Sequence, residues 1–105
     1  MMWKTIVQAR NYQISEGGDI RKLAGRFAGH IMRTHDNGYG YLKVKLAVDY
    51  DRVMFYVHRL VCEAFHGPPP DGAQARHLDG DPRNNHADNL KWGTAEINAE
   101  DKGGG

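Results

Sequence analysis

The last third of the chain is rich in side chains that can bind a metal ion or move a proton. One central histidine is surrounded by acidic and amide residues: His77, Asp79, Asp81, Asn84, Asn85, Asn89 and Asn98. Carboxylate and amide oxygens ligate divalent cations, and a neutral imidazole accepts a proton near physiological pH. This composition indicates metal-dependent or acid–base chemistry.

Charge is divided unevenly along the chain, although the formal net charge of the whole is only +1. Ten basic and five acidic residues lie before residue 61, which gives +5, whereas four basic and eight acidic residues follow, which gives −4. A basic stretch attracts polyphosphate, and an acidic stretch with Asp, Asn and His can hold a cation. The division suits an enzyme that acts on nucleic acid. Two solvated faces are the plain alternative.

Several functional classes are excluded by the sequence. Cys62 is the one cysteine, so a disulfide within the chain and a zinc knuckle built on cysteine pairs are both excluded, and its apolar neighbours predict that it is buried. No apolar run approaches the roughly 20 residues needed to cross a bilayer, and the first residues lack the apolar stretch of a signal peptide. We therefore expect a cytoplasmic protein with no membrane partner.

Period-two alternation and glycine-rich turns predict short strands in the first half, near residues 5–8, 12–15, 19–23, 41–48 and 53–56. The turn between the second and third is expected at residues 16–18. In the 41–48 strand, Leu42, Val44, Leu46 and Val48 share one face, and Tyr41, Lys43 and Lys45 share the other. One face should pack against a core and the other should meet solvent or phosphate.

The pattern then changes to helical spacing. Apolar residues from Val57 to Phe65 predict a helix over residues 57–66, which stops at Gly67 before three prolines. Strands are expected at 75–78 and 89–92, with a polar loop at 79–88 between them and a final helix that opens at Thr94. Trp92 is interpreted as a core residue.

These residues resemble two known families. The resemblance to the HNH endonucleases of phages and mobile introns rests on Val57-His58-Arg59-Leu60-Val61, Arg76-His77-Leu78-Asp79-Gly80-Asp81, Asn84-Asn85, Asn89-Leu90-Lys91-Trp92, Thr94 and Asn98. The N-terminal half, through Trp3-Lys4-x-Ile6 and Tyr12-Gln13-Ile14-Ser15-x-x-Gly18-x-Ile20-Arg21, resembles the modular DNA-binding segment that often precedes such a nuclease. The resemblance implies an α+β fold, in which an N-terminal antiparallel β meander is followed by a ββα-metal unit. The expected parts are a DNA-binding segment at 1–56, the nuclease motif at 57–102 and a flexible tail at 103–105.

The resemblance also implies roles for single residues. His77 would be the general base, and Asn89, twelve residues later, would brace the loop and orient His77. Asn98, nine residues further on, would ligate the metal ion, so His77 and Asn98 are expected to converge on one cation. Oxygen ligands favour Mg²⁺ or Mn²⁺, with other transition metals as alternatives.

Arg76 departs from the pattern, because several relatives have Asp or His immediately before the base as a second metal ligand. Arginine cannot ligate a metal, so either Asn98 holds the cation with water and phosphate, or Asp79, Asp81 or His58 completes the shell. Arg76 could instead bind the scissile phosphate through its guanidinium group. Loss of catalysis with retention of DNA binding is the other interpretation.

The remaining candidates order the loop or contact DNA. Asp79, Asn85 and His58 are interpreted as loop-ordering residues, although bonding of His58 to local backbone or to a phosphate is an alternative. For DNA binding we select Lys43, Lys45, Arg21 and Arg59. Lys22, Arg26 and Arg33 would form a broader cationic surface.

Together these features predict a monomeric, metal-dependent endonuclease that acts on double-stranded DNA and nicks one strand per active site. If a phage encodes it, the expected cytoplasm is that of the host. A catalytically inactive HNH domain that binds DNA is the second hypothesis. A structural or zinc-stabilised interaction domain is the third, and the absence of cysteine pairs argues against it.

Overall fold

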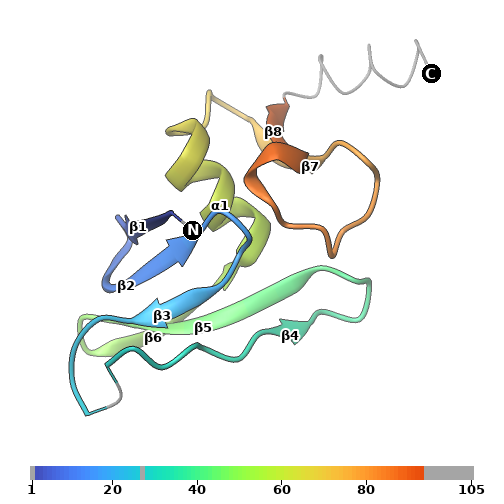
Figure 1. The fold of residues 1–105 in the computed structure, drawn as a ribbon. Helices are drawn as coiled ribbons and strands as arrows, with labels where there is room; N and C mark the ends of the chain where they lie inside the picture. The colour runs from blue at the N-terminus through green and yellow to red at the C-terminus, as the bar shows by residue number, and fades with distance from the viewer. Residues whose placement is uncertain (1, 27, 94–105) are drawn as a thin grey trace, which may run out of the picture.

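Two small antiparallel sheets form the N-terminal half of the computed structural model, which describes residues 2–26 and 28–93 (Figure 1). The first contains β1 (Trp3–Ile6), β2 (Ala9–Ser15) and β3 (Ile20–Lys22), in the order β1-β2-β3. The second contains β4 (His35–Asp36), β5 (Leu42–Val48) and β6 (Asp51–Tyr56), in the order β4-β5-β6. In β5 the predicted alternation is observed, since Val44 and Leu46 are fully buried and Lys45 is exposed.

Helix α1 (Val57–His66) follows β6 without a loop, so that β5, β6 and α1 form a ββα unit. Its apolar side is buried, with Val61 and Cys62 fully inaccessible to solvent. It ends at Gly67, whose positive φ of 81° is the conformation that glycine adopts readily after a helix. Both ends of the helix agree with the prediction.

A two-stranded sheet completes the described part of the chain. β7 (Gln74–His77) pairs antiparallel with β8 (Leu90–Gly93), and the segment between them includes the short 3-10 helix η1 (Ala87–Asn89). Trp92 of β8 is buried, as predicted, and its indole Nε1 donates a hydrogen bond to the carbonyl oxygen of Gly67 at 2.9 Å. This bond ties β8 to the end of α1.

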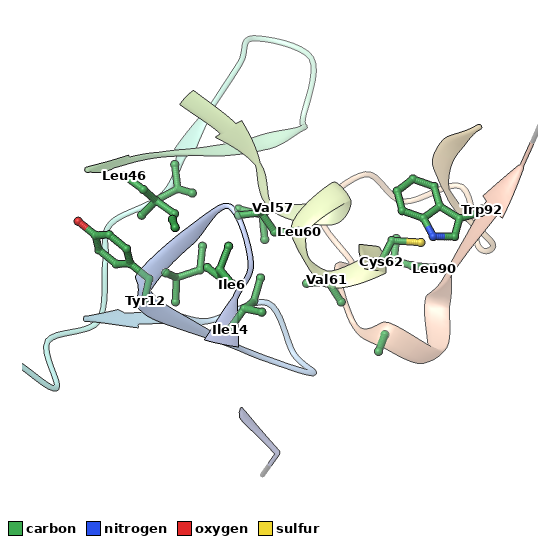
Figure 2. Close-up of a cluster of buried hydrophobic side chains, with 14 of the residues drawn as sticks. Ile6, Tyr12, Ile14, Leu46, Val57, Leu60, Val61, Cys62, Leu90 and Trp92 are labelled. Carbon is green, nitrogen blue, oxygen red and sulfur yellow. The ribbon is translucent and has the colours of Figure 1, made fainter. Parts of the chain in front are cut away.

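Helix α1 is the element that joins the two halves. It contacts β1, β2, β5 and β6 as well as β7, β8 and η1. Figure 2 shows Ile6, Tyr12, Ile14 and Leu46 on one side of the helix and Leu90 and Trp92 on the other. One apolar cluster therefore extends from the N-terminal sheets to the last hairpin.

The predicted α+β class with N-terminal antiparallel strands is confirmed. The expected single meander is divided into two sheets, because residues 23–34 separate β3 from β4. The two-residue strand β4 was not predicted, and other strand ends differ from the prediction by a few residues. The boundary at residue 57 stays a prediction, and the helix from Thr94 and the tail at 103–105 lie outside the described residues. Within the described ranges, no helix is long and apolar enough to span a membrane.

The packing of β5 can be tested with a pair of substitutions on neighbouring strands. Leu46→Ala removes a fully buried side chain and should lower the free energy of unfolding by about 2–5 kcal/mol. Met54→Ala on β6, where the side chain is 44% exposed, should cost less than about 1 kcal/mol. Urea unfolding followed by tryptophan fluorescence measures both. Equal losses would contradict the assignment of the buried face.

Candidate active site

His77 is the last residue of β7, and a neighbouring asparagine fixes the orientation of its ring. Nε2 of His77 lies 2.8 Å from the side-chain oxygen Oδ1 of Asn85. An amide oxygen only accepts hydrogen bonds, so Nε2 must carry the proton. In the neutral ring Nδ1 then has the lone pair, and it is the atom that can accept a proton or bind a cation.

Asn85 is held in place by the turn between β2 and β3. The side chain of Asn85 is buried, and a Cβ atom added to Gly18 would lie 3.2 Å from Cβ of Asn85. The backbone amide of Ala87 also donates to the carbonyl oxygen of Glu16 at 2.7 Å. The N-terminal sheet thus supports the residue that orients His77.

A network of side-chain hydrogen bonds shapes the 78–89 loop, which comprises residues 78 to 89 and includes η1. The carboxylate of Asp79 accepts hydrogen bonds from the amides of Asn84 and Asn89, each at 2.9 Å, and from the backbone of Asp81 at 2.8 Å. The amide of Asn89 also donates to the carbonyl oxygen of Asn84 at 2.8 Å. The bond from Asn84, then those from Asp81 and Asn89, lower the pKa of Asp79 to about 2. Asp79 is therefore ionised at physiological pH and serves as an acceptor within the loop.

Two further contacts hold the outside of the loop. His66, in the last turn of α1, bonds through Nε2 to the carbonyl oxygen of Ala87 at 2.7 Å. Arg83 forms an ion pair with Asp36 at the β4–β5 turn. The 78–89 loop is therefore anchored to α1 and to both N-terminal sheets.

Aromatic rings pack around His77 on the side of α1 and β5. The ring of His58 lies 5.0 Å from the ring of His77, and the ring of Tyr41 lies 5.5 Å and 5.8 Å from these two rings. Tyr56 contacts His58 at 5.6 Å. Burial, followed by the proximity of His77 and Arg59, lowers the pKa of His58 to about 4, so this ring is neutral at physiological pH. Nδ1 of His58 is buried and has no hydrogen-bond partner.

Five candidates from the sequence meet at this place, namely His77, His58, Asp79, Asn85 and Asn89, and some of their contacts differ from the expected ones. The hydrogen bond to the His77 ring comes from Asn85, whereas Asn89 was expected to orient it. Asn89 is occupied by Asp79 and Asn84 within the loop. His58 packs against His77 and has no hydrogen bond to the 78–89 loop in the described part of the chain.

The two remaining candidates for catalysis and metal binding are Arg76 and Asn98. Arg76 precedes His77 on β7 and is half-buried opposite Lys91 of β8. Its catalytic role stays a prediction. Asn98 lies outside the described residues, so its approach to His77 stays a prediction as well.

The predicted DNA-binding residues fall into two groups. Lys43 and Lys45 lie on the outer face of β5, opposite Tyr56 and Met54 of β6. Arg21 and Arg59 have partners within the protein. Arg21 donates twice to Oε1 of Gln13, at 2.7 and 3.0 Å, and stacks on Trp3. Arg59 pairs with Glu63 at 3.2 Å and lies over the Trp92 ring.

Several residues that build the site were not singled out from the sequence. His66 was placed only at the end of the predicted helix, and Tyr56 at the end of a predicted strand. Gly18 was interpreted as part of a hairpin turn. His66 and Gly18 acquire their roles through partners more than 10 residues away, and no local pattern signals such a contact. The ring of Tyr56 contacts His58, two residues further along the chain.

The buried thiol of Cys62 has no place in the site. Cys62 is fully inaccessible, and burial raises the pKa of its thiol to about 11. A thiol that is protonated and buried is a poor nucleophile, so its role is packing. The prediction that Cys62 is buried is confirmed.

Comparison with known proteins identifies the two halves of the chain. A family model described as HNH endonuclease matches residues 55–100, and a model described as NUMOD4 motif matches residues 1–47. The DNA endonuclease I-HmuI of Bacillus phage SP01 is 31% identical over 103 residues, which are 97% of this chain and 58% of that protein. An uncharacterised HNH endonuclease of Acanthamoeba polyphaga mimivirus is 35% identical over 98 residues, which are 92% of this chain and 28% of that protein.

A solved structure supports the same assignment. The structure described as "DNA binding and cleavage by the HNH homing endonuclease I-HmuI" aligns with 99% of this chain and 59% of that chain, with a TM-score of 0.86 and 30% identity. The chain belongs to the HNH endonuclease family and carries an N-terminal NUMOD4 motif. It spans 28% and 58% of the lengths of its two curated relatives.

The family implies a divalent metal ion. Among residues 2–26 and 28–93, no group of three or more His, Cys, Asp or Glu side chains could hold one. His77 nevertheless fits such an ion, because its bond to Asn85 leaves the imidazole lone pair at Nδ1, and imidazole nitrogen is a ligand for Mn²⁺ and related ions. Asp79 fits less well, since its oxygens already accept three hydrogen bonds.

The support of Asn85 by the β2–β3 turn leads to a test at Gly18. Ala at this position must adopt φ of +93°, and its Cβ would press on Asn85 and on Val57. Gly38→Ala is a matched control, because Gly38 has φ of +100° but open space around its Cβ position. Both variants should lose about 1–2 kcal/mol of stability. Only Gly18→Ala should shift the ring ¹⁵N signals of His77 in NMR spectra, and identical spectra for the two variants would contradict the contact.

The loop network leads to a second test, in which the carboxyl ¹³C signal of Asp79 is followed during an acid titration. Its midpoint should lie near pH 2, below the ordinary value of 3.8. Hydrogen bonds to the ionised carboxylate lower its pKa, so Asp79 stabilises the loop above pH 3.8, and this contribution disappears as the pH falls toward 2. Asn84→Ala should raise the midpoint toward 3.8, and Asn11→Ala on β2 should not. A midpoint near 3.8 in the unaltered protein would refute the network.

Proposed function

We propose that this protein is a metal-dependent endonuclease that hydrolyses phosphodiester bonds in double-stranded DNA and nicks one strand per active site. The observation that carries the proposal is the fixed imidazole of His77 in a chain of the HNH endonuclease family. Its relative I-HmuI is described as a DNA endonuclease and as binding and cleaving DNA. One HNH unit in a monomer offers one active centre to one strand, which favours nicking.

In this proposal His77 is the general base. Nδ1 takes a proton from water while the water oxygen forms a bond to phosphorus, and the bond from phosphorus to the 3′ oxygen breaks. Asn85 keeps Nε2 protonated and the ring in position, so that Nδ1 is available for the reaction. Asn89 and Asp79 act indirectly, because they hold the 78–89 loop that carries Asn85.

The same proposal assigns Asn98 as a metal ligand near His77, with Mg²⁺ or Mn²⁺ as the ion. When bound, such an ion supplies positive charge that stabilises the phosphate and the leaving oxygen. Amide oxygen is a ligand for Mg²⁺ and Mn²⁺ alike. The lone pair at Nδ1 of His77 can either bind the ion or accept a proton, and in this proposal it accepts the proton. The assignment rests on the position of Asn98 in the HNH pattern.

DNA would lie along the outer face of β5. Lys43 and Lys45 alternate with the buried Val44 and Leu46, so their ammonium groups share the face that is turned away from the core. Lysines in this position contact phosphates and place the duplex without reading its sequence. Arg21 and Arg59 are weaker candidates, because each already has partners within the protein.

Plasmid nicking tests the proposal. The purified protein should convert supercoiled plasmid to relaxed circles with Mg²⁺ or Mn²⁺ and should stop when EDTA is added. His77→Ala should lower the rate by about 100-fold or more, since general base catalysis contributes about 10² to 10⁴. His35→Ala, on the exposed strand β4, serves as the matched control and should leave the rate unchanged.

Gel retardation separates the endonuclease from an inactive DNA-binding domain. An HNH domain that has lost catalysis, as Arg76 in place of an acidic residue would allow, should shift DNA in a salt-sensitive manner and leave it intact. Cleavage that is equally fast in His77→Ala would refute the assignment of the base.

A further inference from the structure

An open pocket of about 440 Å³ lies directly beside the rings that pack on His77. Residues from β6, α1 and β7 and from the turn before β5 line it, including Asn37, Tyr41, Tyr56, His58, Arg59 and Gln74. His77 does not line the pocket, but its ring lies 5.8 Å from Tyr41 and 5.0 Å from His58, which do. The pocket is therefore a neighbour of the proposed catalytic centre.

The walls of the pocket are aromatic and their edges are polar. Tyr41 and Tyr56 are 37% and 41% exposed, which is unusual for rings that are fixed by their contacts with His58. The hydroxyl of Tyr56 accepts a hydrogen bond from the amide of Asn37 at 3.4 Å. Gln74 of β7 and Asn37 add amide groups that can donate or accept hydrogen bonds at these edges.

The pocket continues the face of β5 that carries the lysines. Tyr56 lies directly opposite Lys43, and Lys45 follows Lys43 on the same side of the strand. A phosphate backbone that follows Lys45 and Lys43 toward His77 therefore passes the opening between Tyr41 and Tyr56. Fixed aromatic rings next to a cationic track are the features by which proteins hold unstacked bases.

We propose that this pocket binds one unstacked nucleobase of the DNA strand that is cut, next to the scissile phosphate. The base stacks on Tyr41 and Tyr56, and its polar edge meets Asn37 and Gln74. The inference rests on the proposed endonuclease function and deepens it, because it assigns a base-holding subsite beside the catalytic one. Holding a base outside the stack fixes the backbone at the neighbouring phosphate.

Binding of short single strands tests this subsite without any cleavage. Fluorescence anisotropy in EDTA compares a thymidine octamer with an octamer of the same length made of abasic sugar phosphates. The two probes have the same phosphates, so their difference reports the bases. The unaltered protein should bind the thymidine octamer about tenfold more tightly.

Substitutions then test which residues cause the protein to prefer the thymidine octamer over the abasic octamer. Tyr41→Leu and Tyr56→Leu should each reduce it to about twofold or less, and Tyr41→Phe, which keeps the ring, should retain it. Tyr50→Leu is the matched control, because Tyr50 is fully exposed in the turn between β5 and β6 and should change nothing. Lys43→Ala should weaken the binding of both probes equally, as expected of a phosphate contact.

The outcomes test the base-holding proposal separately from the proposed nuclease activity. Equal binding of both probes by the unaltered protein, or full discrimination in Tyr41→Leu and Tyr56→Leu, would overturn the base-holding proposal even if plasmid nicking is observed. Discrimination that depends on both tyrosines would support the subsite even in a protein that does not nick DNA.

Discussion

The hydrogen bond between His77 and Asn85 is the interaction on which the proposed chemistry depends. It selects the tautomer of the imidazole and thereby the nitrogen that carries the lone pair. A strand-ending histidine beside a long polar loop would otherwise rotate and exchange protons between its two nitrogens. Because Asn85 comes from that loop, the geometry of the base depends on every contact that holds the loop in shape.

The N-terminal half supports the 78–89 loop in addition to its proposed role in DNA binding. The turn after β2 supports Asn85 and receives the backbone amide of Ala87, while Asp36 before β5 binds Arg83. Helix α1 fills the space between the sheets and supplies His66 to the same loop. A β7–β8 hairpin with four residue pairs would be marginal alone, so its stability comes from these neighbours.

Sequence patterns predicted the elements better than the contacts. The helix at 57–66 was predicted with its observed ends, because apolar spacing, Gly67 and the prolines are all local signals. Strand β5 was predicted within one residue, because the alternation of its apolar and polar residues is also a local signal. Strand β4 has two residues and depends on pairing with β5, so its own sequence contains no signal for it. Asn89 was expected to brace the loop and to orient His77. It bonds to Asp79 and Asn84 within the loop, whereas the direct hydrogen bond to His77 comes from Asn85, a contact that only the folded chain shows.

The division of charge along the chain suggested a metal site and a DNA-binding surface, but some of the charged residues are engaged by partners within the protein. Asp79 belongs to the acidic part that suggested a metal site, yet its carboxylate is occupied by amide groups of the loop. Arg21 belongs to the basic part that suggested DNA binding, yet Gln13 and Trp3 engage it. The outer face of β5 carries two lysines, Lys43 and Lys45. Tyr41, whose ring lies beside that of His77, precedes them in the chain. Because two lysines can neutralise few phosphates, precise placement of the scissile bond requires contacts of another kind, and the aromatic rings next to His77 are in position to provide them.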